Sequence, residues 1–175
     1  MILKLDLVKA FDRVNWTFLR LVLLHIGIPF VGVNWILGCV ETSNFVVLVN
    51  GIPSKFFLAS RGIKQGCPLS PLLFILIIES LSMLIHDAQQ RGVITGVKIT
   101  SSLFLTHLLF VDDVLLFGEA TVDEWQQYKQ LLDLFYSATG MQINEKKSIL
   151  LFNDIDELAK ANIGAILPYK MELVS

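Results

Sequence analysis

The chain has 175 residues and a mass of 19.7 kDa, a length that suits one domain, or part of a larger protein, with a sizeable core. With 54% hydrophobic and 17% charged residues, it is neither a disordered chain nor a low-complexity or collagen-like repeat. Because 14 basic residues face 16 acidic ones, no overall basic field exists, and any binding to nucleic acid must be local. The two cysteines lie far apart and predict neither a disulfide framework nor a zinc site.

An uncharged stretch at residues 21–40 has the length of a membrane span. It contains the breaker cluster Gly27-Ile28-Pro29, which ends one helix and starts another. We therefore expect no membrane partner, and a membrane-associated helical protein is the third of three readings. The N-terminus also lacks the pattern of a secretory signal.

The first elements follow from local patterns. Period-two alternation predicts a strand over residues 2–7, with Asp6 near its end. Asn15 is expected to cap a helix over residues 16–25, and a second short helix covers 32–40. Asn50-Gly51 predicts the turn of a hairpin that joins residues 45–49 to 55–59, and a loop follows over 61–68.

The second half begins with the strongest helix start, Ser70-Pro71, from which a buried helix should reach about residue 90. A short strand at 97–99 precedes a hairpin over 104–117, which carries Asp112 and Asp113 at its tip. An amphipathic helix over 123–139 and a strand over 149–152 complete the pattern, and the signals fade after Asn153. The predicted fold is α/β (α+β), a mixed sheet with helices packed on one face.

The adjacent acids at the hairpin tip are the chemical anomaly of this sequence. Two like charges about 4 Å apart repel by roughly 4 kcal/mol at an effective dielectric constant of 20, so a dry tip would need a cation. The alternative is a solvated turn, where Asp is common. Asp6 ends another apolar strand, and carboxylate oxygens from two strands suit Mg²⁺. A pair of such ions stabilises in-line phosphoryl transfer.

Four segments, in this order, resemble motifs A to D of reverse transcriptases, particularly those of plant non-LTR (LINE-type) retrotransposons. They are KLDLVKAFD at 4–12, GIKQGCPLSP at 62–71, FVDD at 110–113 and GMQINEKKS at 140–148. The resemblance covers residues 1–152, and it implies the palm of a right-hand polymerase.

The resemblance implies that Asp6 and Asp112 bridge two Mg²⁺ ions, with Mn²⁺ as an alternative, and that Asp113 completes the acidic cluster. The reaction would be nucleotidyl transfer from a dNTP to a primer 3′-hydroxyl on an RNA template. Lys147 matches the lysine proposed to protonate the leaving pyrophosphate, and the adjacent Lys146 is the alternative.

Other roles are carried over in the same way. Phe11 matches an aromatic steric gate under the sugar, although an ordinary core residue is the alternative; Ala10 would lie near the triphosphate through its backbone. Gln65 and Gly66 match residues that approach the nucleotide and template, unless they form a plain loop.

Three further residues have a simple alternative. Arg61 and Lys64 are candidate contacts to nucleic-acid phosphates, with surface solvation as the alternative. We interpret His107 as a hydrogen-bonded strand residue rather than a metal ligand.

The sequence also departs from the family pattern. The family places a fingers segment before motif A, where this chain begins. A primer grip and a thumb should follow motif D, but residues 153–175 form a divergent tail. We therefore expect a truncated RNA-directed DNA polymerase palm with little activity alone. Its partners would be an RNA template with a DNA primer, dNTPs, and the missing fingers and thumb. Its location would be intracellular, and nuclear by family analogy. The alternative is a non-catalytic remnant that acts as a protein-interaction module.

Overall fold

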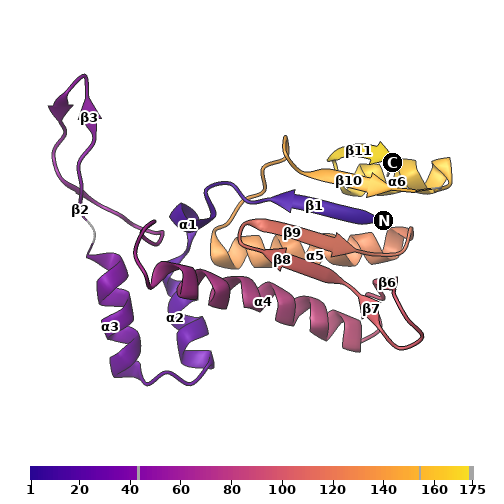
Figure 1. Cartoon of the computed structure of the whole chain (residues 1–175), viewed down its shortest axis with the longest axis horizontal. Helices are drawn as coiled ribbons and strands as arrows, with labels where there is room; N and C mark the ends of the chain where they lie inside the picture. Colours follow the sequence, from indigo (N-terminus) through magenta and orange to yellow (C-terminus); the bar gives the residue numbers. More distant parts are fainter. Residues whose placement is uncertain (43, 154, 174–175) are drawn as a thin grey trace.

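The computed structural model describes residues 1–42, 44–153 and 155–173, and its centre is a five-stranded sheet in the order β11-β10-β1-β9-β8 (Figure 1). The strands are β1 (Ile2–Asp6), β8 (His107–Phe110), β9 (Asp113–Phe117), β10 (Ile149–Phe152) and β11 (Lys170–Leu173). Neighbouring strands are antiparallel except β10 and β11, which are parallel. The sheet is therefore mixed, as the sequence predicts.

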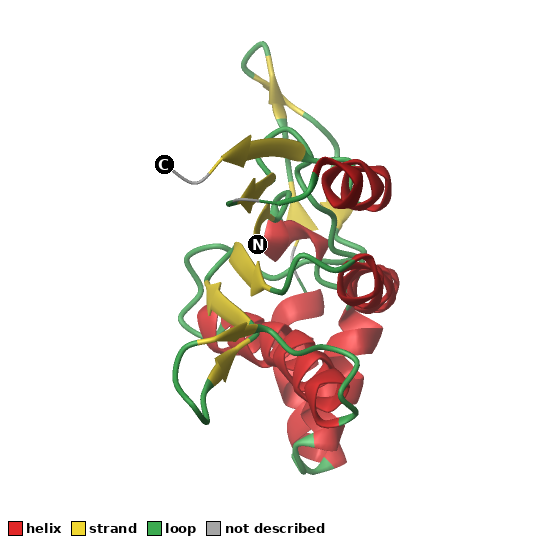
Figure 2. Ribbon diagram, turned by 90° about the vertical axis from the view of Figure 1, so that its right-hand side faces the viewer, coloured by secondary structure: helices red, strands yellow, loops and turns green. Residues whose placement is uncertain are grey.

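Helices cover one face of this sheet, as Figure 2 shows with the strands on one side and the long helices on the other. The covering helices are α4 (Ser70–Gln90), α5 (Val122–Thr139) and α6 (Glu157–Ile166). In β1, Leu3 and Leu5 are buried, while Lys4 and Asp6 between and after them are more accessible. Because side chains alternate across a strand, Lys4 and Asp6 share the face opposite the core.

Residues 21–40 do not form one helix. They belong to α2 (Trp16–His25) and α3 (Phe30–Glu41), which confirms the break predicted at Gly27 to Pro29. The Asn15 Oδ1 atom accepts hydrogen bonds from the N–H groups of Thr17 and Phe18 at 2.8 and 3.2 Å, and so caps α2 as expected. Among the described residues one helix, α4, has the length and hydropathy of a membrane span, and several of its residues are part of the buried core.

The shorter elements lie around this body. They are α1 (Ala10–Arg13), β2 (Asn44–Phe45), β3 (Leu48–Val49), β4 (Ile52–Pro53), β5 (Phe57–Leu58), β6 (Val97–Lys98) and β7 (Phe104–Leu105). Residues 44–58, which we call the projecting hairpin, extend away from the body (Figure 1). Its turn is at Asn50-Gly51 as predicted, but the returning strand begins at Ile52, directly after the turn, rather than at residue 55.

The structure continues beyond Phe152, where the sequence patterns predict no further element. The Asp156 Oδ2 atom accepts hydrogen bonds from the N–H groups of Leu158 and Ala159 and starts α6. Ile163 of this helix and Leu167 after it are buried, and β11 then pairs with β10. Residues 157–173 thus form part of the same body as the central sheet.

Candidate active site

Two motifs meet where β1 ends. In the antiparallel pair of β1 and β9, Asp6 lies opposite Asp113, and the N–H of Leu7 donates a hydrogen bond to the carbonyl oxygen of Asp112 at 3.3 Å. Residues that face each other across neighbouring antiparallel strands point to the same side of the sheet. The fold therefore brings the backbone of the three predicted acids together at one edge.

Asp112 lies in a tight turn. Phe110 pairs with Asp113, so that Val111 and Asp112 alone connect β8 to β9. The φ angle of Val111 is 53°, in the left-handed region that β-branched residues rarely adopt. Asp112 is exposed at this turn. The hairpin tip predicted from the sequence is confirmed, and its backbone is strained.

Two of the acids are paired with lysines. The Nζ of Lys147 lies 3.8 Å from Asp6 Oδ1, and the Nζ of Lys4 lies 3.7 Å from Asp113 Oδ1. Asp6 is the more enclosed of the two acids, with 20% of its side chain exposed. Loose, solvent-accessible pairs of this kind contribute about 0–1 kcal/mol, so a stronger cation displaces them at low cost.

The donor set at this edge has the chemistry of a hard-cation site. It offers carboxylate oxygens, which Mg²⁺ prefers, and the ammonium groups already near them show that the edge accommodates positive charge. In the described part of the chain, however, no three His, Cys, Asp or Glu side chains are arranged as a metal-binding group. The residues fit a metal by type and by position along the strands.

A turn in the fourth motif positions Lys147. The N–H of Asn144 donates to the carbonyl oxygen of Asp6 at 2.8 Å, and the N–H of Lys147 donates to the carbonyl oxygen of Asn144 at 3.0 Å. The buried Ser148 Oγ donates to the same Asn144 oxygen and accepts a hydrogen bond from the N–H of Asp6. Lys147 rather than Lys146 is thereby placed beside Asp6.

The first and second motifs are joined by main-chain hydrogen bonds. The N–H groups of Gly62 and Ile63 donate to the carbonyl oxygens of Val14 and Phe11, each at 2.8 Å. Gly62 has a φ of 92°, and a Cβ there would lie 2.7 Å from the carbonyl oxygen of Asp12. Only glycine fits this crossing.

Phe11 and Ala10 follow β1 in α1. The ring of Phe11 stacks on Phe74 of α4, with a centroid distance of 4.6 Å and an interplanar angle of 10°. It is half-buried, whereas Ala10 is buried, so Ala10 offers a ligand little beyond its backbone. The gate role of Phe11 stays a prediction.

The second-motif loop lies beside α1. Lys64, Gln65 and Gly66 are exposed in it, and Gly66 has open space where a side chain would be. Arg61, Lys64 and Gln65 line a cavity of about 520 Å³ together with Asp12. The contacts of Arg61 and Lys64 with nucleic-acid phosphates, and the approach of Gln65 and Gly66 to nucleotide and template, stay predictions.

His107 is bonded on both sides, as the sequence analysis expects. Its Nδ1 lies 2.9 Å from the Thr106 hydroxyl and its Nε2 lies 3.0 Å from the Ser82 hydroxyl of α4. Burial lowers its pKa, an effect that Glu79 opposes and His86 reinforces. It therefore links the sheet to α4.

The residues that sequence reasoning missed are Asn144, Ser148 and Gly62. All three lie inside the motifs themselves, but their roles come from hydrogen bonds and packing to Asp6, Val14 and Asp12, far away in the chain. No local pattern signals such contacts.

Comparison with known proteins agrees with this arrangement. The sequence profile described as reverse transcriptase (RNA-dependent DNA polymerase) matches residues 1–162. The Pol polyprotein of the type-2 retrotransposable element R2DM from Drosophila melanogaster is 31% identical over 146 residues, covering 83% of this chain and 13% of that protein. An uncharacterised mitochondrial protein of Arabidopsis thaliana is 46% identical over 67 residues, covering 38% of this chain and 55% of that protein.

A solved structure shares the fold. Telomerase from Candida albicans, determined in complex with a fragment of telomeric RNA, superposes with a TM-score of 0.60 at 17% identity, over 84% of this chain and 27% of that one. The mixed sheet with helices on one face is thus a polymerase palm. The chain belongs to the family described as reverse transcriptase (RNA-dependent DNA polymerase), and it spans about half or less of the length of these relatives.

Proposed function

We propose that this chain acts as the catalytic palm in RNA-directed DNA synthesis. A primer 3′-hydroxyl, paired to an RNA template, attacks the α-phosphate of a dNTP, and pyrophosphate leaves. The observation that carries this proposal is the register of Asp6 opposite Asp113, with Asp112 in the adjoining turn and Lys147 alongside. Membership of the family supports it.

Asp6, Asp112 and Asp113 would hold Mg²⁺, or Mn²⁺ in its place. When bound, a pair of such ions stabilises the charge that develops on the attacking and leaving oxygens. The protein contributes the acidic edge, held in place by the β1–β9 register and by the bond from Leu7 to Asp112.

The remaining residues act on the substrate. Lys147 would donate a proton to the leaving pyrophosphate, since its ammonium group already lies beside Asp6. Phe11, held by its stack on Phe74, would exclude a ribose 2′-hydroxyl. Gln65 and Gly66 would approach the nucleotide and the template, and Lys64 a phosphate.

The test compares metal binding and primer extension in three proteins. Asp112→Asn removes one acid of the cluster, and Asp87→Asn is the matched control because Asp87, near the end of α4, is exposed and paired with Arg91 just after the helix. We expect Asp112→Asn to weaken Mn²⁺ binding, followed by electron paramagnetic resonance, at least tenfold, and Asp87→Asn to leave it unchanged.

Primer extension on an RNA template with Mg²⁺ and dNTPs gives the second readout. We expect little extension by the chain alone, and none in Asp112→Asn. Equal Mn²⁺ binding in Asp112→Asn and the unaltered chain, or extension that survives the substitution, would contradict the proposal.

A second candidate function is that of a protein-interaction module without catalysis. The projecting hairpin favours it, because its apolar residues are exposed, among them Ile52 at 71% and Phe56 at 79%. Apolar surfaces of this kind mark interaction sites. A chain that binds no Mn²⁺ at the acids and yet associates through this hairpin would support the second candidate over the first.

A further inference from the structure

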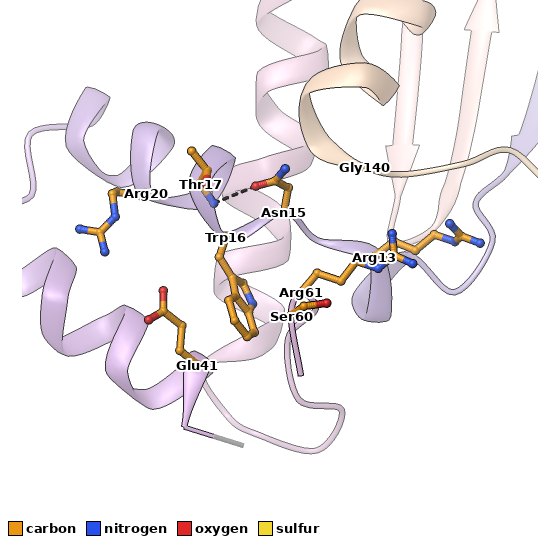
Figure 3. A pocket seen from close by; sticks show the side chains of 9 residues that line it. All are labelled: Arg13, Asn15, Trp16, Thr17, Arg20, Glu41, Ser60, Arg61 and Gly140. Carbon is orange, nitrogen blue, oxygen red and sulfur yellow. Dashed lines mark hydrogen bonds between the residues drawn. The ribbon is translucent and has the colours of Figure 1, made fainter. Parts of the chain in front are cut away.

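A separate cavity of about 470 Å³ lies between the end of α1, the first half of α2, the end of α3 and residues 60–61 (Figure 3). Its lining includes three arginines, Arg13, Arg20 and Arg61, and a single acid, Glu41, among the residues that the structure describes. In a chain whose net charge is −2, this is a local concentration of positive charge. Such a concentration attracts anions without any overall basic field.

Among the described residues none of the three arginines forms an ion pair, but one of them has other contacts. Arg20 donates to the Asn34 Oδ1 at 2.9 Å and lies over the Phe30 ring, so it is already engaged. Neither Arg13 nor Arg61 forms an ion pair within residues 1–42, 44–153 and 155–173. In the same part of the chain the Nε of Arg13 is buried without a hydrogen-bond partner, which is costly for a charged group.

The two side chains also share a direction. In Figure 3 Arg13 and Arg61 extend to the same side of the cavity, while Arg20 and Glu41 lie on the other side of Trp16. Two guanidinium groups that share a cavity repel each other unless an anion lies between them. Their planar forks suit the tetrahedral oxygens of a phosphate.

Hydrogen bonds join the segments that form the walls of this cavity. The Trp16 Nε1 donates to the Gly62 carbonyl oxygen at 2.7 Å, and the Asn15 N–H donates to the Thr139 carbonyl oxygen at 2.9 Å. The first turn of α2 is not the anion site, because the N–H groups of Thr17 and Phe18 already donate hydrogen bonds to the Asn15 Oδ1 atom. The arginines must supply the binding.

We propose that Arg13 and Arg61 form a phosphate-binding site separate from the acidic edge of the sheet. The phosphate belongs to a nucleic-acid backbone or to a free phosphate or nucleotide. Only the first source rests on the proposed function, because a polymerase palm handles a nucleic-acid strand. The site itself follows from the unpaired guanidinium groups.

The test measures binding in the presence of EDTA, so that a metal at the acids contributes nothing. The variants are Arg13→Gln, Arg61→Gln and the double substitution, with Arg91→Gln as the control because Arg91 is exposed and paired with Asp87. Circular dichroism checks the fold. Arg61 is exposed, so Arg61→Gln keeps the proposal testable if Arg13→Gln fails to fold.

Two probes distinguish the sources of the phosphate. A labelled single-stranded RNA oligonucleotide is followed by fluorescence anisotropy at several salt concentrations, and pyrophosphate is followed by NMR shift changes. For a backbone phosphate, we expect the double variant to bind RNA at least tenfold more weakly, with a salt slope reduced by about 0.7 per lost contact. For a free phosphate, pyrophosphate binding falls instead and RNA binding is unchanged.

The site is overturned if neither probe binds, or if the arginine variants and Arg91→Gln bind both probes as the unaltered chain does. Failure here differs from failure of the proposed function, because Asp112→Asn should keep RNA and pyrophosphate binding in EDTA while losing Mn²⁺ binding.

Discussion

Gly62 and Gly66 show how differently two glycines of one loop can act. Both have positive φ angles, 92° and 84°, which cost any other residue about 1–2 kcal/mol. A Cβ at 62 would also meet the Asp12 carbonyl oxygen at 2.7 Å, whereas a Cβ at 66 would meet no atom within 4 Å. The crossing of the first two motifs therefore depends on Gly62.

We expect Gly62→Ala to lower the free energy of unfolding by clearly more than Gly66→Ala, which should lose only the about 1–2 kcal/mol of backbone strain. Urea denaturation of both variants measures the difference. If both variants lost the same free energy of unfolding, α1 and the loop could move apart without cost. The close approach of position 62 to Asp12 would then not be needed for stability.

The residues of the candidate site differ in how well the sequence alone reveals them. Asp6, Asp112 and Asp113 stand out because carboxylates at the ends of apolar strands are unusual in themselves. Ser148 does not stand out, because its hydrogen bond to the Asp6 N–H joins residues 142 positions apart. A hydroxyl has no local signature of such a partner.

At the scale of elements, His107 joins β8 to α4 through the Ser82 hydroxyl. Because burial lowers its pKa in the folded chain, the unfolded chain binds more protons at acidic pH. The stability that His107 contributes is therefore complete above about pH 6.5, its ordinary pKa, and is lost as the pH falls below that value.

We expect the urea concentration at the unfolding midpoint of the unaltered protein to decrease when the pH is lowered from 7.5 to 5.5. In His107→Gln the same change of pH should decrease it less. His25→Gln is the control, since His25 is exposed on α2. If His107→Gln keeps the full pH dependence, other groups cause it and the coupling through Ser82 has no part.

Elements differ in how well their sequences announce them. The long helix α4 has a clear start at Ser70-Pro71 and α5 has helical periodicity, and both lie where the sequence predicts them. The strand predicted at 97–99 is present as β6, but β7 and the single turn of α1 carry too few residues for any period. Such elements are defined by their pairing with neighbouring segments, and the local sequence does not show which segments these are.

At the scale of the whole molecule, α6 and β11 extend the sheet and helical layer beyond the predicted final strand. Ile163 is fully buried, whereas Leu158 of the same helix is 70% exposed. We expect Ile163→Ala to lower the free energy of unfolding by about 2–4 kcal/mol, and Leu158→Ala by less than about 0.5 kcal/mol. Thermal or urea unfolding measures both changes. A small effect of Ile163→Ala would show that this region unfolds independently of the sheet.

The general architecture was predictable, since alternating strands and apolar helices leave few ways to bury both. Strand order was not, because the parallel pairing of β10 with β11 depends on α6 crossing between them. The cavity with Arg13 and Arg61 was equally hidden. It is built from segments that meet only in the folded chain.

The left-handed backbone conformation of Val111 has a consequence for engineering this protein. If stability alone were optimised, glycine or asparagine would be favoured at that position, because both tolerate a positive φ better than valine. The chain instead tolerates a local energetic penalty beside Asp112, in the two-residue connection between β8 and β9. A substitution that stabilises the protein by relieving the strain in this turn would also change the position of the adjacent Asp112 carboxylate, on which DNA synthesis is proposed to depend.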